Sequence, residues 1–282
     1  MQSTIPQKAF KHDVALPVIG QGTWEMEHDD DPAKAIRVGI EHGLTHIDTA
    51  EMYGSGRVEA MLGKALRGCR DQTYLVSKVL PFNASRHGTI AACERSLRHL
   101  RTDYLDLYLL HWPGSEPLEE TVAAFEQLQT DGKIRAWGVS NFDVDDLEKL
   151  LTVVPATEVA CNQVLYHPGE RTIETRVLQF CTHHDIPVVA YSPVGHGSLM
   201  RSAGKRGADT LARIAQARGV SVYQVALQFV IRHNNVFAIP KASRVEHVLD
   251  NAAAAGWTLS QDEVDALEAA LPAPSRGHLP ML

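Results

Sequence analysis

From Val18 onward, the chain alternates short apolar segments with segments in which apolar residues recur at helical spacing. Several of the short segments, such as Leu107–Leu110 and Val188–Ala190, lack polar alternation, as expected of strands buried on both faces of a parallel sheet. The pattern predicts eight strands: Val18–Gly22, Leu44–Thr49, Thr73–Lys78, Tyr104–His111, Ile134–Ser140, Val159–Val164, Pro187–Ser192 and Val236–Pro240.

Capping residues and glycines predict where the intervening helices begin and end. Asp31 followed by Pro32 predicts a helix start, and Gly43 lies just past the end of that helix. Two further helices are predicted: Thr89–Leu100, capped by Asn83 or Ser85, and Leu118–Thr130, ended by Asp131 and Gly132.

These elements form eight strand–helix units of roughly 23–33 residues, the size of a crossover unit. Since no linker or low-complexity segment divides the chain, residues 1–282 are predicted to form a single (β/α)8 barrel. We expect a hairpin within Ile5–Val14, two extra helices, and a loop or extended arm after Leu271. An open doubly wound sheet is the alternative, but Gly20–Gly22 lacks the third glycine and the helix start of a dinucleotide-binding turn.

Composition narrows the class of protein. The 27 basic and 34 acidic residues give a net charge of -7 without a cluster of Lys or Arg, which argues against nucleic acid as a partner. No apolar run approaches the roughly 20 residues that span a bilayer, and Met1–Phe10 lacks the apolar core of a signal peptide. The four cysteines are scattered, without a CxxC pair. We therefore expect a cytoplasmic protein with reduced thiols, no membrane partner and no metal site.

Polar or aromatic residues stand at the end of every predicted strand. In a parallel barrel these ends meet at one mouth, where catalytic groups gather. Any one of them has an ordinary structural explanation, such as a turn or a satisfied core histidine, but their regular recurrence favours a site. The residues are Gln21, Thr23, Trp24, Asp48, Lys78, His111, Ser140, Asn141, Gln163, Tyr191, Ser192 and Lys241.

Three adjacent strands thus carry a carboxylate, an ammonium and an imidazole. A lysine that ends a buried strand needs a partner, and Asp48 on the neighbouring strand can supply it for Lys78. Tyr53 follows in the loop after Asp48, where the Lys78 charge is expected to lower its pKa and make it a general acid near neutral pH. His111 is expected to bind the same substrate oxygen.

At these residues the sequence resembles the aldo-keto reductase superfamily. The resemblance spans nearly the whole chain in the family's order, and within the superfamily it is strongest to bacterial methylglyoxal-reductase-like and diketogluconate-reductase-like members. The segments that carry it are Gly43–Gly54, Val76–Lys78, Asp106–Pro113, Gly138–Phe142, Asn162–Gln163, Ala190–Pro193 and Ile239–Lys241.

The resemblance implies a barrel fold, an NADPH cofactor bound without a Rossmann fold, and a catalytic tetrad of Asp48, Tyr53, Lys78 and His111. In it Tyr53 is the proton donor, Lys78 lowers its pKa, Asp48 pairs with Lys78, and His111 orients the carbonyl. The nicotinamide is expected to stack on Tyr191. The implied cofactor contacts are Gly22, Thr23, Asp48, Ser140, Asn141, Gln163, Tyr191, Ser192, Pro193, Val194, Ser198, Lys241, Ser243, Arg244, His247 and Asn251.

At the adenosine end the chain departs from the family pattern. His247 stands where an arginine is expected, and Arg244 lies three residues earlier. We predict that Arg244 binds the 2′-phosphate together with Lys241 and Ser243, because its planar fork of donors suits a phosphate. NADPH is therefore favoured over NADH.

On the substrate side, Trp24 and Trp112 are expected to flank the carbonyl together with Tyr53 and His111. The short tail after Leu271 predicts an open pocket for small aldehydes and 2-oxoaldehydes such as methylglyoxal, and the resemblance implies a monomer. Two alternatives stay open: a Schiff-base lyase or aldolase that uses Lys78 or Lys241, and a non-catalytic nucleotide-binding regulatory subunit. The aspartate beside Lys78 disfavours the first, because it keeps the amine charged.

Overall fold

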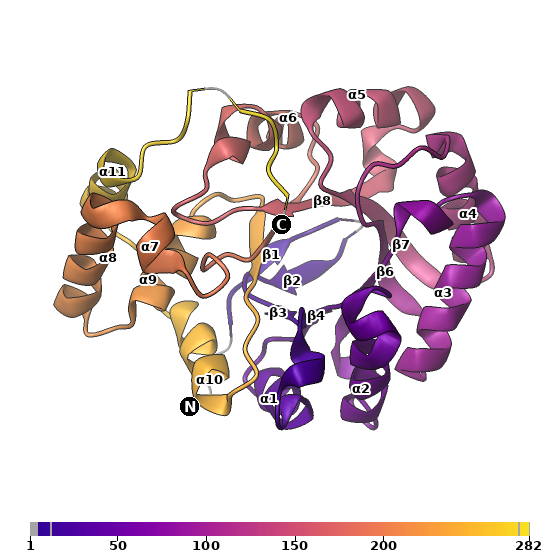
Figure 1. The fold of residues 1–282 in the computed structure, drawn as a ribbon, viewed down its shortest axis with the longest axis horizontal. Helices are drawn as coiled ribbons and strands as arrows, with labels where there is room; N and C mark the ends of the chain where they lie inside the picture. Colours follow the sequence, from indigo (N-terminus) through magenta and orange to yellow (C-terminus); the bar gives the residue numbers. More distant parts are fainter. Residues whose placement is uncertain (1–4, 12, 276, 282) are drawn as a thin grey trace.

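Eight parallel strands form the centre of the computed structural model, which describes residues 5–11, 13–275 and 277–281. Each strand pairs with the next along the chain, and parallel bridges from Ile19 to Ala238 and from Gly22 to Lys241 join the first strand to the last. The predicted barrel is confirmed (Figure 1). Its strands are β3 (Gln21–Gly22), β4 (His46–Asp48), β5 (Tyr74–Val79), β6 (Leu105–Leu110), β7 (Ile134–Ser140), β8 (Val159–Leu165), β9 (Val188–Tyr191) and β10 (Val236–Ile239).

Helices surround this barrel in the order of the chain (Figure 1). Those that follow the strands are α1 (Pro32–Glu41), α2 (Arg57–Ala65), α3 (Arg86–Leu100), α4 (Leu118–Thr130), α5 (Val144–Val153), α6 (Val177–His183), α9 (Val222–Val230) and α10 (Val245–Ala254). Additional helices are α8 (Gly204–Arg218), α11 (Gln261–Ala270) and the single turn α7 (Leu199–Ser202). Short 3-10 segments are η1 (Met26–His28), η2 (Tyr53–Gly56), η3 (Arg70–Gln72), η4 (Pro81–Asn83), η5 (Ala156–Glu158) and η6 (Thr172–Thr175).

Local sequence explains several of these boundaries. The Asp31 side chain accepts a hydrogen bond from the Lys34 amide at the start of α1, and Gly43 follows that helix at φ 88°, where a side chain would be strained. Ser85, rather than Asn83, caps α3, so this helix starts at Arg86, three residues before the predicted start at Thr89.

The N-terminal hairpin closes the bottom of the barrel. It pairs β1 (Gln7–Ala9) with β2 (Ala15–Pro17), so its second strand lies beyond the predicted segment Ile5–Val14. Phe10 packs edge to face on Phe237, at 5.3 Å between ring centroids, and on Tyr74, at 5.9 Å. These aromatic contacts anchor the hairpin against two non-adjacent strands of the barrel, β10 and β5.

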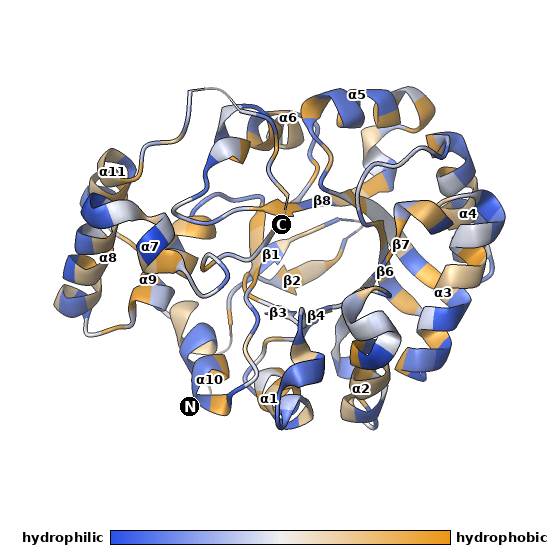
Figure 2. Ribbon diagram, in the orientation of Figure 1, coloured by the Kyte–Doolittle hydropathy of each residue, from blue (hydrophilic) through white to orange (hydrophobic). Residues whose placement is uncertain are grey.

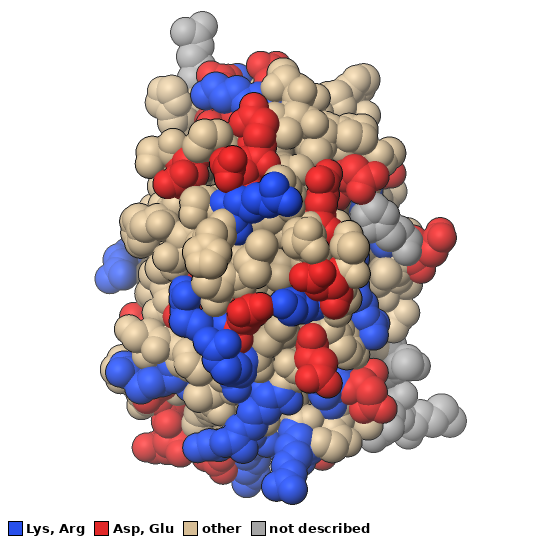
Figure 3. Space-filling view, turned by 90° about the vertical axis from the view of Figure 1, so that its right-hand side faces the viewer, with Lys and Arg blue, Asp and Glu red and all other residues tan. Residues whose placement is uncertain are grey.

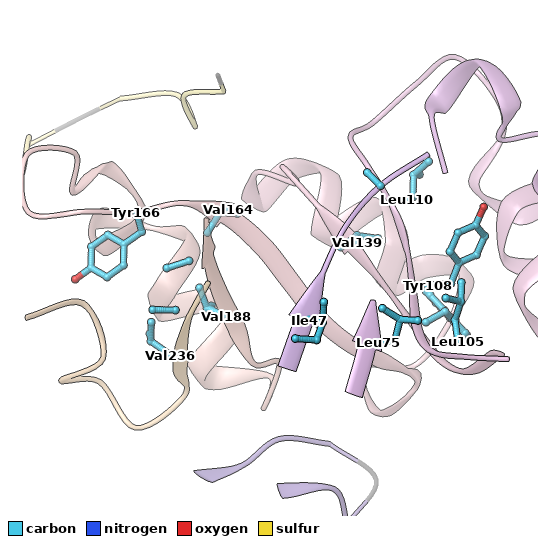
Figure 4. Packing of buried hydrophobic residues seen from close by; sticks show 14 of the residues in the cluster. Ile47, Leu75, Leu105, Tyr108, Leu110, Val139, Val164, Tyr166, Val188 and Val236 are labelled. Carbon is cyan, nitrogen blue, oxygen red and sulfur yellow. The ribbon is translucent and has the colours of Figure 1, made fainter. Parts of the chain in front are cut away.

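Two layers of apolar residues pack against the strands, and a third apolar cluster packs α8, α9 and α11 together. One fills the barrel with inward-facing side chains such as Val76, Leu109 and Val189. The other lies between the strands and the helices, where Ile47, Leu75 and Tyr108 are among the residues labelled in Figure 4. The surrounding helices carry both hydrophobic and hydrophilic residues (Figure 2), as expected of helices with one buried face.

The segment after α11 returns across the top of the barrel. In Figure 1 the part of this segment at residues 277–281 runs toward the barrel axis. The Leu279 amide donates a hydrogen bond to Asp143 Oδ2 at 3.2 Å, which ties this arm to the start of α5. The expected extended arm is therefore present, and it lies over the mouth.

The distribution of surface charge and the length of the helices bear on whether nucleic acid or a membrane could be a partner. Acidic and basic side chains are interspersed on the face drawn in Figure 3, with basic ones gathered toward its lower edge. Within the described residues, no helix is both long and apolar enough to cross a bilayer.

Candidate active site

A cavity of about 790 Å³ opens at the C-terminal ends of the strands. Most of the residues that the sequence singled out lie in its wall. They are Gly22, Thr23, Trp24, Asp48, Tyr53, His111, Trp112, Ser140, Asn141, Gln163, Tyr191, Ser192, Pro193, Val194, Lys241, His247 and Asn251. Lys78 does not line the cavity itself, but its Nζ contacts the hydroxyl of Tyr53, which does.

Parallel strand register brings the charged residues of the predicted tetrad together. Lys78 is fully buried, and its Nζ donates to Asp48 Oδ1 at 2.6 Å and to the Thr49 carbonyl at 2.8 Å. The same Nζ lies 3.3 Å from the Tyr53 hydroxyl. Asp48 Oδ2 accepts a hydrogen bond from the Gln163 amide at 2.7 Å. The ammonium, carboxylate and phenol therefore form one connected group inside the barrel.

Electrostatics keep Lys78 charged. Burial alone disfavours an ammonium, but the Asp48 carboxylate and the Tyr53 oxygen outweigh it and raise the pKa of Lys78 above its usual value. A lysine in this state is a poor nucleophile, because its lone pair carries a proton.

The expected direction of the Tyr53 pKa shift is wrong. Burial raises the pKa of Tyr53, and the nearby Lys78 ammonium offsets only part of this rise, while Asp48 adds to it. The phenol is therefore held protonated at neutral pH. The Lys78 charge therefore reduces the cost of forming a phenolate without bringing the pKa of Tyr53 below its usual value.

His111 is held neutral beside the phenol. Its ring centroid lies 6.0 Å from that of Tyr53, and burial together with the Lys78 charge puts the pKa of His111 well below its usual value. Its Nδ1 is buried without a hydrogen-bond partner within the described residues. Asn141 Nδ2 donates to the His111 backbone carbonyl at 3.0 Å, which restrains the chain just after β6. A neutral imidazole in this position can donate one hydrogen bond to a substrate oxygen.

A network of polar side chains lines the part of the cavity wall at the ends of β7, β8 and β9. The Tyr191 hydroxyl donates to Asn141 Oδ1 at 2.9 Å, and Ser140 Oγ donates to the Gln163 carbonyl at 2.8 Å. Gln163 in turn donates to Asp48, so this wall is connected to the tetrad. The network restrains the Tyr191 side chain in the cavity wall, and its stacking on the nicotinamide stays a prediction.

The loop after β9 bends with left-handed backbone conformations. Ser192, Gly195, His196 and Gly197 have φ values of 48°, 68°, 50° and 74°. Ser198 Oγ donates to the Gly195 carbonyl at 2.7 Å and so stabilises the bend, although Ser198 itself is not in the cavity wall. The turn directs Ser192, Pro193 and Val194 into the cavity.

At the far end of the cavity the basic residues already have acidic partners. Lys241 pairs with Asp29 at 2.8 Å, and Glu246 lies 3.2 Å from Arg244 and 3.3 Å from His247. Arg244 also contacts His247 directly. His247 and Asn251 line the cavity, whereas Ser243 and Arg244 lie outside its wall, and their role at the 2′-phosphate stays a prediction.

The predicted substrate side of the cavity is aromatic, as expected, and the C-terminal arm adds an apolar residue to it. The Trp24 ring lies 4.9 Å from that of Tyr53, and the Trp112 ring lies 4.9 Å from that of His111. Met281 of the C-terminal arm also lines the cavity. The tail therefore contributes to the cavity wall, and the open pocket for small aldehydes stays a prediction.

Several residues in the wall were not predicted. Most lie in loops or on helices whose course depends on tertiary contacts, which strand-end patterns do not reveal. Met52 adjoins Tyr53 and Asp250 adjoins Asn251 in the sequence, so their position next to predicted site residues is the signal that could have identified them. The residues are Glu25, Met52, Tyr223, Ile239, Asp250 and Met281. His196 and Gly197 also line the cavity, in the loop after β9 where the resemblance implies the pyrophosphate of the cofactor.

Comparison with known proteins identifies the class of protein to which this site belongs. Residues 18–272 match the model of the aldo/keto reductase family. The chain is 50% identical over 269 residues to a methylglyoxal reductase, YeaE, of Escherichia coli, covering 94% of each chain. It is 34% identical to a glyoxal reductase of Bacillus subtilis, covering 91% of this chain and 89% of the relative.

Solved structures agree with this result. An aldo/keto reductase from Klebsiella pneumoniae, in complex with NADP and acetate, superposes with a TM-score of 0.94 at 45% identity, covering 99% of this chain and 100% of that one. A second structure of a Klebsiella pneumoniae aldo-keto reductase contains NADPH and has the same TM-score at 46% identity. The chain belongs to the aldo/keto reductase family, and it is an oxidoreductase.

Proposed function

We propose that this protein reduces small aldehydes and 2-oxoaldehydes to alcohols with NADPH, and that Tyr53 is the general acid. The observation that carries the proposal is the connected group of Asp48, Lys78 and Tyr53 at the base of an aromatic cavity. A protonated phenol, a charged lysine and a neutral imidazole together can stabilise and protonate one developing alkoxide. The whole chain, residues 1–282, is proposed to act as one catalytic domain.

The cavity suits an elongated cofactor. Its wall continues from the tetrad past Tyr191 and the bend at Ser192 to His247 and Asn251. Gly22 faces Lys241 across the barrel seam, and a Cβ on Gly22 would lie 2.6 Å from the Ile239 carbonyl oxygen, so the strands approach closely here. We propose that Tyr191 supports the nicotinamide, and that the network of Ser140, Asn141 and Gln163 holds its carboxamide.

The complexes of the Klebsiella pneumoniae relatives with NADP and NADPH support this choice of cofactor. When bound, NADPH supplies the hydride that the carbonyl carbon receives. Lys241, His247 and Asn251 would hold the adenosine end, with Arg244 and Ser243 at the 2′-phosphate. This requires Lys241 and Arg244 to exchange their pairing with Asp29 and Glu246 for pairing with the phosphate.

In the proposed reaction, side chains of this protein transfer one proton to the substrate. Tyr53 donates its hydroxyl proton to the carbonyl oxygen, which leaves an alcohol and a phenolate. The Lys78 ammonium at 3.3 Å stabilises that phenolate, and Asp48 holds Lys78 in place. His111 donates a hydrogen bond to the same substrate oxygen and so orients the carbonyl. A proton from solvent then restores Tyr53.

The aromatic wall and the two named relatives support 2-oxoaldehydes as the substrate class. Trp24, Trp112 and Met281 offer apolar contacts to a small carbonyl compound. The Escherichia coli relative is named a methylglyoxal reductase, and the Bacillus subtilis relative a glyoxal reductase. The raised pKa of Lys78 argues against a Schiff-base lyase, which requires a neutral amine.

The test is turnover of the purified protein with NADPH and with NADH against a panel of aldehydes that includes methylglyoxal and glyoxal. The proposal expects cofactor oxidation coupled one to one with alcohol formation, with higher kcat/KM for NADPH. Nucleotide binding without turnover of any aldehyde would refute it and favour the regulatory alternative. Trapping of a borohydride-reduced adduct on Lys78 would favour the lyase.

A further inference from the structure

Glu51 is a buried carboxylate between Asp48 and Tyr53 that takes no part in the chemistry described above. Its side chain is only 10% exposed. Oε1 accepts hydrogen bonds from the Leu80 amide at 2.8 Å and from Asn83 Nδ2 at 3.0 Å, and Oε2 accepts one from Arg95 Nη2 at 3.1 Å. Both carboxylate oxygens are therefore used.

These contacts join three segments of the chain. Glu51 belongs to the loop that leads from β4 to Tyr53, and Arg95 lies on α3. Leu80 directly precedes the turn η4, which follows the strand of Lys78, and Asn83 is the last residue of that turn. The Glu51 amide also donates to the Lys78 carbonyl at 3.4 Å. The carboxylate therefore connects the loop carrying the phenol to the end of the strand carrying the ammonium.

The loop has an irregular backbone that needs such support. Tyr53 begins η2, in which Gly54 and Ser55 have φ values of 55° and 54°. A left-handed conformation at a residue other than glycine is maintained by the surrounding structure. The Tyr53 ring is held on one side by Trp24 and on another by His111, but these edge-to-face contacts restrain the ring rather than the backbone of the loop.

The distance between the Tyr53 hydroxyl and Lys78 Nζ is already 3.3 Å, near the limit of a hydrogen bond. A small outward shift of the loop would break this contact. The geometry points to Glu51 as a positioning residue, which fixes the loop so that the Tyr53 hydroxyl stays within reach of Lys78 and of the substrate oxygen. This inference rests on the proposed function, because it assigns Tyr53 the role of proton donor.

Three variants separate this role from ordinary stabilisation. Glu51→Ala removes all three side-chain contacts. Glu51→Gln keeps an amide oxygen that can accept from Leu80 and Asn83 but loses the ion pair with Arg95. Arg95→Ala removes the same ion pair from the other side, where the arginine side chain is 43% exposed. The two latter variants are matched controls, because neither removes the link between the loop and the segment after Lys78.

We expect Glu51→Ala to lower kcat for methylglyoxal by roughly 10- to 100-fold, since a misplacement of about 1 Å carries a cost of that order. KM and the Kd of NADPH, measured by fluorescence titration, should stay nearly constant, because the cofactor wall is not touched. Glu51→Gln and Arg95→Ala should keep kcat within about fivefold of the wild type, as expected for the loss of a partly exposed ion pair.

The pH profile provides a second readout. Tyr53 is faced by Lys78, Asp48 and His111, and of these Lys78 is the one that favours phenolate. A phenol that has moved outward loses burial, the largest cause of its raised pKa, together with the contact to Lys78, so the alkaline limb of kcat should shift to lower pH in Glu51→Ala. A merely destabilised protein would show no such shift.

Either of two outcomes would overturn the inference: Glu51→Ala with kcat and alkaline limb like the wild type, or a loss of kcat matched by an equal loss of NADPH binding. Wild type and Tyr53→Phe are assayed in parallel to test the proposed function separately. An inactive wild type, or an active Tyr53→Phe, would refute the proposed function and this inference with it. An active wild type with an unaffected Glu51→Ala would refute the role of Glu51 alone.

Discussion

Lys78→Met tests how far the barrel depends on the ion pair inside it. The variant leaves the Asp48 carboxylate, only 3% exposed, without the ammonium that lies 2.6 Å away in the wild type. Removing one partner of a buried pair costs about 3–5 kcal/mol, because the other charge is then uncompensated. At about 2 °C per kcal/mol for a chain of this size, the expected loss in Tm is roughly 6–10 °C.

A double variant separates the cost of the unpaired charge from the loss of packing. Lys78→Met with Asp48→Asn contains neither charge, and the asparagine oxygen can still accept the hydrogen bond that Gln163 donates to Asp48. We expect this variant to regain about 2 kcal/mol or more over Lys78→Met, while remaining inactive.

The assay is urea unfolding followed by circular dichroism at neutral pH, on the wild type, both single variants and the double variant. The reasoning would be refuted by a double variant whose loss of stability equals the sum of the two single losses. That result would mean that the two side chains do not interact in the folded protein.

Three further predictions concern His46 in strand β4, Arg244 at the far end of the cavity and Met281 in the C-terminal arm. Burial lowers the pKa of His46 to about 4, so the folded state binds fewer protons than the unfolded state between pH 4 and 6.5. The free energy of unfolding should therefore fall as the pH drops from 6.5 toward 4, by up to about 1.4 kcal/mol per pH unit. His46→Asn should reduce this slope in urea unfolding, and an unchanged slope would contradict the assignment. Arg244→Ala should weaken NADPH binding roughly 10- to 100-fold and NADH binding little, measured by titration; equal losses would show that Arg244 does not contact the 2′-phosphate. Met281→Ala should raise KM for aldehydes with apolar substituents without changing the Kd of NADPH; an unchanged KM across the panel would remove the C-terminal arm from the substrate site.

Much of the barrel could be predicted because each strand and helix carries its own local signal. Apolar runs without alternation marked β6 and β9, and a cap followed by Pro32 marked α1. The convergence of Asp48 and Lys78 followed from the rule that parallel strands end at one mouth. These inferences need only local patterning and one property of the fold class.

The parts that could not be predicted depend on contacts between distant segments. The C-terminal arm reaches the mouth through the Leu279 contact with Asp143, which has no signature in the sequence of the tail. The second strand of the hairpin lies beyond the predicted segment because its register is set by pairing with Gln7–Ala9. The direction of the Tyr53 pKa shift depends on the extent of burial, which outweighs the effect of Lys78 and is known only from the fold.

The central claim is that Tyr53 protonates the substrate oxygen, and single-turnover kinetics of Tyr53→Phe test it most directly. The enzyme, loaded with NADPH, is mixed rapidly with methylglyoxal, and oxidation of the cofactor is followed beside a titration of NADPH affinity. The account predicts that the rate falls by roughly 10²- to 10⁴-fold while the Kd of NADPH stays unchanged. A variant that oxidises NADPH at a rate close to that of the wild type would contradict it.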